Sequence, residues 1–209
     1  MPRAHWHLKD DPYLQRMRAA GIAPEDIDFV MCTHLHADHV GWNTRLEDGR
    51  WVPTFPNAQY VFGRTEYEHW LASPFPNPIM RTAFNDSVLP VVEAGRAMMI
   101  DEGEQIDPAL SVQMAPGHTP GNLCIYLNGD GDRAVFAGDV IHHPIQVWFP
   151  EWSTVACTDP IASAASRRKV LEYCADRGAL LLPAHFAAPH GGRVEPEHDH
   201  FRLRWREPD

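Results

Sequence analysis

The chain has 209 residues, of which 44% are hydrophobic and 22% charged, and its formal net charge is −10. This length suits one globular domain, and we predict a single domain over residues 1–209. Phosphate binding requires clustered Lys and Arg, so the acidic balance argues against a nucleic-acid partner. One basic trio falls on an expected helix and is interpreted as a solvated helix face: Arg167, Arg168 and Lys169.

The cysteines and the N-terminus indicate the compartment. Cys32, Cys124, Cys157 and Cys174 show no CxxC spacing, which favours free thiols in a reducing compartment over a disulfide framework or a cysteine zinc site. The N-terminus is polar, and no apolar run approaches the length of a membrane span. We therefore expect a cytoplasmic protein without a membrane partner, or a secreted protein only if an upstream segment carries a signal.

The predicted elements alternate between helices and buried strands. A helix is expected over 11–21, a strand over 28–33, another strand over 58–63 and a helix over 64–72. The segment 73–78 is a proline-rich loop. Segment 85–95 is ambiguous, because its proline argues against an unbroken helix.

From residue 97 onward the pattern is mainly β. Apolar runs predict strands over 97–101, 110–117, 122–128, 133–139 and 179–185, and NGDG at 128–131 predicts a hairpin turn. The clearest helix spans 159–178, with Asp159 as its cap, Pro160 in the first turn and Gly178 at its end. The polar tail that follows residue 185 is expected to fray.

The stretch THLHADHVG, residues 33–41, crowds metal-ligand chemistry at the end of an expected strand. Neutral imidazole and carboxylate are usual ligands of zinc and related metals. In an extended segment residues i and i+2 point the same way, so His34 and His36 can share one metal. If the chain then turns into a helix, Asp38 and His39 are redirected toward a second metal.

Three more histidine or aspartate residues follow apolar β runs: His118 in APGHTPG, Asp139 in VFAGDV and His185 in LLLPAH. Strand ends can bring side chains to one point, and a carboxylate such as Asp139 can bridge two cations. We predict that Asp139 lies between two metals, the first held by His34, His36 and His118, and the second by Asp38, His39 and His185.

This ordered set resembles the metallo-β-lactamase-fold hydrolase superfamily, from about residue 11 to about residue 193. The resemblance implies an α/β fold, a metallo-β-lactamase-type αββα sandwich, with two divalent metal ions, zinc first and manganese, cobalt or iron as alternatives. Only about 27 residues precede the HxHxDH strand, where family members carry several strands. We therefore expect the first sheet to be incomplete at the N-terminus, and an uncovered edge or face would favour a homodimer.

THLHADHVGWN and GDVIHHPIQ are most similar to the branch holding N-acyl-homoserine lactonases and methyl parathion hydrolase. The resemblance implies hydrolysis of a small-molecule lactone, carboxylic ester or organophosphate by a metal-bridging hydroxide. The lactonases carry a catalytic Tyr three residues after the bridging Asp, where this chain has His142. We expect His142 to act as hydrogen-bond donor or proton shuttle. Asp38 is the other expected proton donor, and His143 and His190 are expected to be non-ligands.

Four aromatic residues lie near the predicted site residues in sequence and are expected to line an apolar substrate pocket: Trp42, Trp148, Phe149 and Trp152. The alternative is that they are ordinary core or surface aromatics. Other functions also fit the motif. They are a glyoxalase-II-like thioesterase or β-lactamase of the same fold, a mononuclear-iron sulfur dioxygenase, and an inactive metal-binding remnant or subunit.

Overall fold

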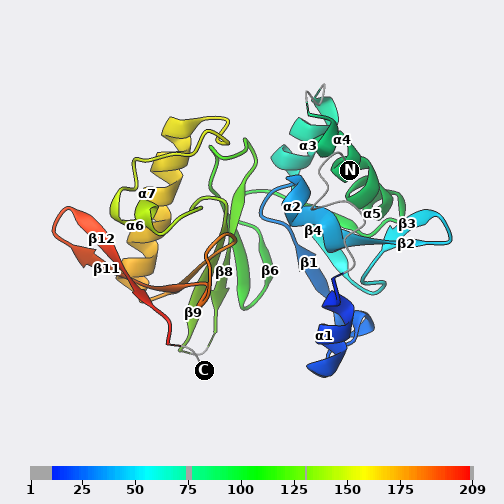
Figure 1. The fold of residues 1–209 in the computed structure, drawn as a ribbon, viewed down its shortest axis with the longest axis horizontal. Coiled ribbons are helices and arrows are strands. Elements are labelled where there is room, and N and C mark those ends of the chain that lie inside the picture. Colours follow the sequence, from blue (N-terminus) through cyan, green and yellow to red (C-terminus); the bar gives the residue numbers. More distant parts are fainter. Residues whose placement is uncertain (1–10, 74–76, 130, 208–209) are drawn as a thin grey trace. The chain divides into compact units, whose positions relative to one another are not determined.

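Short strands and helices alternate along the chain in the computed structural model, which describes residues 11–73, 77–129 and 131–207 (Figure 1). The predicted loop 73–78 and the NGDG turn each include residues outside this described part. The elements fall into two compact units, one within Met1–Phe62 and Trp70–Met99, the other within Gly63–His69 and Ile100–Asp209. The prediction of one domain over residues 1–209 stays a prediction.

The first unit is built on a small sheet whose strands lie in the order β1-β4-β5, with β1 parallel to β4. The apolar residues of β4 are buried, as expected for a central strand. The predicted break near Pro90 is confirmed, because one helix ends at Ser87 and the next begins at Leu89. The elements that begin in this part of the chain are α1 (Tyr13–Ala19), η1 (Pro24–Asp26), β1 (Phe29–Met31), α2 (Ala37–Val40), η2 (Gly41–Asn43), β2 (Thr44–Glu47), β3 (Arg50–Pro53), β4 (Gln59–Gly63), α4 (Pro78–Ser87), α5 (Leu89–Glu93) and β5 (Ala97–Ile100), and α3 (Arg64–Ala72) begins in the second unit.

The second unit contains a seven-stranded sheet in the order β12-β11-β10-β9-β8-β7-β6. Only β9 and β10 pair in parallel, and the other neighbours are antiparallel. The strands predicted over 110–117, 122–128, 133–139 and 179–185 are all found here. The elements are β6 (Gln105–Asp107), β7 (Leu110–Met114), β8 (Leu123–Asn128), β9 (Arg133–Gly138), α6 (Ile145–Trp148), α7 (Pro160–Arg177), β10 (Leu180–Pro183), β11 (Gly192–Glu197) and β12 (His200–Trp205).

Helix α7 connects the two parallel strands and packs on β9 and β11 (Figure 1). Its predicted ends are confirmed. The Asp159 carboxylate accepts hydrogen bonds from Ile161 N and Ala162 N, both at 2.9 Å, and Gly178 ends the helix in the left-handed conformation with φ 61°. Apolar residues of α7 and of the sheet form one buried cluster, which is the core of this unit. Among the helices of the described residues, none combines the length and apolar character needed to cross a bilayer.

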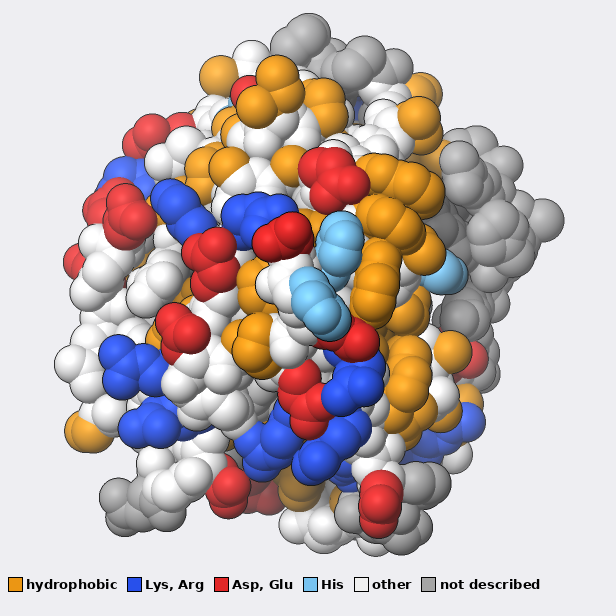
Figure 2. Space-filling view, turned by 90° about the vertical axis from the view of Figure 1, so that its left-hand side faces the viewer, with side chains coloured by type: hydrophobic (Ala, Val, Ile, Leu, Met, Phe, Trp, Pro, Cys, Tyr) orange, Lys and Arg blue, Asp and Glu red, His pale blue; other side chains and the backbone are white. Residues whose placement is uncertain are grey.

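The expectation of a frayed tail is wrong, because the tail forms β11 and β12 at the edge of the larger sheet. Val194 and Phe201 are buried in the core of the unit. Arg202 pairs across the strands with Glu195, with Nη2 and Oε2 2.8 Å apart. Figure 2 shows Lys and Arg side chains mixed with Asp and Glu on this side of the molecule. The charged residues that alternate along the tail therefore form the outer face of the β11–β12 hairpin.

The interpretation of the basic trio on α7 as a solvated face is wrong for one member. Arg168 and Lys169 are exposed, but Arg167 is 0% exposed and lies inside the second unit. A charged side chain is rarely buried unless its polar atoms are bonded. The guanidinium of Arg167 donates hydrogen bonds to three backbone carbonyls in the loop that follows β9.

The four cysteines are all free thiols, and they differ in how deeply they are buried. Cys124 and Cys174 lie in the core of the second unit, and burial raises the pKa of Cys174 to about 12 and that of Cys124 further. Burial also raises the pKa of Cys32 to about 11, although a hydrogen bond with Asn43 opposes the rise. Cys157 is only partly buried.

Titration of the native protein with an aromatic disulfide reagent at about pH 8 should therefore show a single fast-reacting thiol. Thiolate is the reactive form, and a buried thiol with a raised pKa stays protonated at that pH. The substitution Cys157→Ser should remove the fast phase, and Cys32→Ser should leave it. All four thiols should react in guanidinium chloride. A second fast thiol in the native protein would contradict the burial of the others.

Candidate metal centre

The first group of candidate ligands follows β1 and is called here the HxHxDH cluster: His34, His36, Asp38 and His39. The chain stays extended to His36, which has φ −67° and ψ 154°, and then enters the short helix α2. This is the turn into a helix on which the assignment of Asp38 and His39 to a second metal depends. It lets His34 and His36 face one way and redirects Asp38 and His39.

Within the HxHxDH cluster the imidazole nitrogens converge. His34 Nε2 and His36 Nδ1 are 3.1 Å apart, and the ligand atoms of Asp38 and His39 are also neighbours, with Oδ2 and Nε2 3.7 Å apart. Two nitrogens bound to one tetrahedral zinc at its usual bond length would be separated by about 3.4 Å. The His34–His36 pair therefore fits a shared metal without a change of backbone.

Neighbouring residues fix these rings. The Thr33 hydroxyl lies 3.2 Å from His34 Nδ1, so the other ring nitrogen of His34 is the one turned to His36. His36 also meets the ring of Trp70 edge-on, with centroids 5.5 Å apart. His34 is 1% exposed, so its ring cannot reorient freely. Such outer contacts are how proteins set the tautomer and direction of a ligating histidine.

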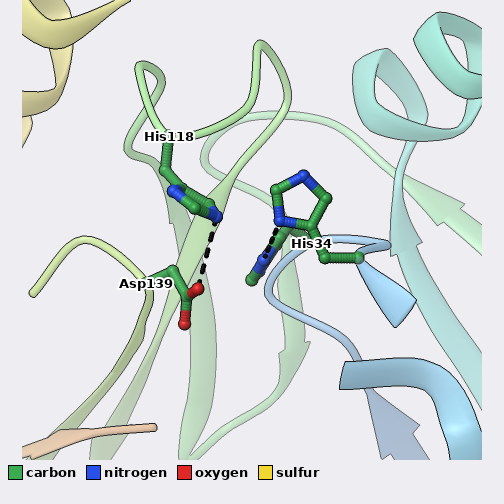
Figure 3. Close-up of side chains that lie close together, drawn as sticks. His34, His118 and Asp139 are labelled. Atoms are coloured by element: carbon green, nitrogen blue, oxygen red, sulfur yellow. Dashed lines mark hydrogen bonds and ion pairs between the residues drawn. The ribbon is translucent and has the colours of Figure 1, made fainter. Parts of the chain in front are cut away.

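The second group lies in the other unit and is called here the Asp139 cluster: His118, Asp139, His142 and His185. Asp139 is 3% exposed, and both of its oxygens face imidazoles. His118 Nε2 is 3.3 Å and His142 Nε2 is 3.2 Å from Oδ2, and His185 Nε2 is 3.2 Å from Oδ1. Figure 3 shows His118 and Asp139 joined in this way.

The sheet explains why these residues meet. His118, Asp139 and His185 follow β7, β9 and β10, three strands that run in the same direction, so their carboxyl ends lie along one edge. The loop that carries His118 is pressed against α7. Gly117 has φ +132°, and a Cβ atom there would lie 2.0 Å from Ser163 N. Only glycine permits this approach.

His142 is a member of the Asp139 cluster rather than an isolated surface histidine. Its ring stacks on His185, with centroids 5.6 Å apart and planes 3° apart. Its backbone N–H donates to Gln146 Oε1 at 2.7 Å. The ring nitrogen that faces Asp139 is therefore held by contacts on both the side chain and the backbone.

Other residues have local partners. His143 Nδ1 accepts a hydrogen bond from Ile145 N at 3.1 Å, and His190 Nδ1 lies 3.0 Å from Phe186 O. That His143 and His190 are non-ligands stays a prediction. Cys157 Sγ lies 3.9 Å from His118 Nδ1, the ring nitrogen that faces away from Asp139. The sequence offered no signal for this contact.

Three of the four aromatic residues predicted to line a pocket contact one another or a residue of β12. Trp148 stacks on His200 of β12, with centroids 5.2 Å and planes 13° apart, and Phe149 stacks on Trp152 at 4.6 Å. Trp42, in the other unit, lies 4.9 Å from the ring of Tyr13. A pocket role for Trp42, Trp148, Phe149 and Trp152 stays a prediction.

The donor set fits a divalent metal. Each cluster offers imidazole nitrogens beside a carboxylate oxygen, within 4.8 Å for His34 with His36, Asp38 with His39, and His118 with Asp139. Nitrogen and oxygen ligands of this kind suit zinc, manganese, cobalt and iron, and no thiolate is among them. The predicted ligands in each unit are therefore brought together as the motif requires.

Proteins of similar sequence include N-acyl homoserine lactonases. N-acyl homoserine lactonase AttM of Agrobacterium fabrum is 29% identical over 199 residues, which cover 88% of this chain and 71% of the relative. AttM of Azorhizobium caulinodans is 28% identical over 144 residues, which cover 58% of this chain and 47% of the relative, so this chain matches under half of that protein's length.

Solved structures confirm the predicted fold class. A hydrolase named AbOPH in the beta lactamase superfamily superposes with a TM-score of 0.82 at 24% identity, covering 95% of this chain and 70% of that one. AidC, a dizinc quorum-quenching lactonase, gives 0.76 at 24% identity and covers 97% of this chain and 72% of its own. The sequence model of the Metallo-beta-lactamase superfamily matches residues 6–185. The chain belongs to the metallo-beta-lactamase superfamily.

Proposed function

We propose that this protein is a dinuclear metal-dependent hydrolase whose substrates are lactones, with carboxylic esters and organophosphates as related substrates. The observation that carries the proposal is the buried Asp139 carboxylate with imidazoles facing both of its oxygens. A carboxylate that has imidazoles beside both of its oxygens is suited to bridge two cations. Relatives named as N-acyl homoserine lactonases support the lactone as first choice.

The two clusters together would supply both metal sites. His34, His36 and His118 would hold one metal, Asp38, His39 and His185 the other, and Asp139 both. Bound divalent metals would supply Lewis acidity and a hydroxide nucleophile near neutral pH. The protein then needs no serine or cysteine nucleophile, in keeping with the buried, protonated state of Cys32 directly before the motif.

The leaving group of the reaction also needs a residue that donates a hydrogen bond or a proton to it. His142 Nε2 faces Asp139 at 3.2 Å and is proposed to donate a hydrogen bond to the departing oxygen. Asp38 is the second proposed group to return a proton to the leaving group, because its side chain is 38% exposed. His142 has the firmer support, since its ring is stacked and its backbone is bonded.

Elemental analysis of protein purified without added metal should find about two divalent ions per chain. Hydrolysis of an N-acyl homoserine lactone should be lost on chelation and return with zinc or cobalt. The substitution Asp139→Ala should lower metal content and remove most activity, because it deletes the proposed bridge. The matched control is His143→Asn, which changes an exposed neighbour of the cluster and keeps an acceptor for Ile145 N.

Two results would overturn this proposal. One iron per chain with oxygen uptake would identify the dioxygenase alternative. A folded protein that takes up no metal would identify an inactive remnant or a subunit of a larger assembly.

The role of His142 can be tested apart from metal binding. The substitution His142→Phe keeps a ring that can stack on His185 and removes the donor. It should lower kcat for lactone hydrolysis by roughly 10²-fold or more with metal content unchanged. His142→Tyr restores a donor and should retain more activity than His142→Phe. Equal activity of the two variants would show that His142 donates no hydrogen bond in the reaction.

A further inference from the structure

Arg167 is a charged side chain in the interior of the second unit. It lies on α7, is 0% exposed and ranks among the largest fully buried side chains of the described residues. Burial lowers the pKa of its guanidinium, which reflects the cost of removing the charge from water. Arginine nevertheless remains protonated in proteins. A buried charge of this kind is often less favourable for stability than a well-packed apolar side chain.

The guanidinium donates most of its hydrogen bonds to the loop between β9 and α7. Nε donates to Val140 O at 2.8 Å, and Nη1 donates to Pro150 O at 2.6 Å and to Trp152 O at 2.8 Å. Nη2 donates to the Ser163 hydroxyl on α7 at 3.1 Å. One planar group therefore ties both ends of the loop to the helix, an arrangement that the single ammonium of lysine cannot reproduce.

Gln146 secures the middle of the same loop. It is 3% exposed, and its Oε1 accepts hydrogen bonds from the backbone N–H groups of His142 at 2.7 Å and His143 at 3.2 Å. Its Nε2 donates to Trp152 O at 2.8 Å, the carbonyl that Arg167 also binds. The backbone of His142 is thereby connected to Arg167 through one glutamine and one shared carbonyl.

A second path leads from Arg167 to His118. The Ser163 hydroxyl that receives the guanidinium also accepts a hydrogen bond from Cys157 Sγ at 3.4 Å. Cys157 Sγ lies 3.9 Å from His118 Nδ1. Arg167 is thus linked to the two histidines that approach Oδ2 of Asp139 from opposite chain segments.

We propose that Arg167, acting with Gln146, is a positioning residue that fixes the loop 139–152 and so sets the distance between His142 and Asp139. This inference rests on the proposed hydrolase function. A misplacement of about 1 Å in a reacting group can cost on the order of 10²-fold in rate. Accurate placement of His142 would explain why the fold tolerates a buried charge at this position.

The test compares Arg167→Lys with Arg168→Lys in the full-length, metal-loaded protein. The second change is the matched control, because Arg168 is the exposed neighbour on the same helix. Arg167→Lys should lower kcat for lactone hydrolysis by roughly 10- to 100-fold with little change in KM, since the charge stays while the three carbonyl contacts are lost. Arg168→Lys should match the wild type.

A loss of stability alone could also lower activity, so the test needs a readout of geometry. The visible spectrum of the cobalt-loaded protein and the ring-nitrogen NMR signals of His142 and His118 provide one. Both should change in Arg167→Lys and stay unchanged in Arg168→Lys. If Arg167→Lys does not fold, Gln146→Glu serves instead, because it keeps an acceptor for His142 N and loses the donor to Trp152 O.

The outcomes separate this inference from the proposed function. A folded Arg167→Lys protein with wild-type kcat and unchanged histidine signals would overturn the positioning role. If the wild type itself neither binds metal nor hydrolyses lactones, the proposed function fails. The histidine signals of the metal-free protein then decide the placement of His142 and His118, with a shift in Arg167→Lys supporting it and no shift overturning it.

Discussion

The second unit is organised around a carboxylate that water can hardly reach. An ionised Asp139 in the interior is costly unless its charge is met by hydrogen bonds or cations, and three imidazole nitrogens lie within 3.3 Å of its oxygens. This arrangement requires three strand ends at one edge of a sheet. The antiparallel pairing of β7, β8 and β9 and the parallel crossover from β9 through α7 to β10 provide it, so the strands that form the main core cluster also place the ligands.

The loop after Asp139 creates a second electrostatic problem. Irregular backbone inside a protein leaves carbonyl and N–H groups that must find partners, because water is not there to bind them. Arg167 and Gln146 supply these partners from two directions. The polar interior behind Asp139 is therefore continuous with the candidate site, and the loop gains a defined conformation where a purely apolar core would leave its backbone unsatisfied.

Local sequence signals predicted the parts of this protein that local physics controls. The caps of α7, the break near Pro90, the main strands and the clustering of ligands within each unit follow from turn chemistry, apolar runs and strand ends. The tail was misjudged because β11 and β12 are stabilised by pairs such as Arg202 with Glu195, which depend on strand register. Arg167 was misjudged because nothing next to it in sequence reports the distant carbonyls that it binds.

The register of β11 and β12 has a consequence for how copies of the protein meet. Among the described residues, β12 is one of the two outer strands of the larger sheet, and its arginines alternate with Phe201 and Leu203. Another strand that docked beside β12 would bring its side chains against guanidinium groups already paired with Glu195. Charged outer strands discourage this kind of addition. The β12 edge of the larger sheet is therefore protected from joining sheets of neighbouring molecules, which lowers the tendency of this edge to nucleate fibrils.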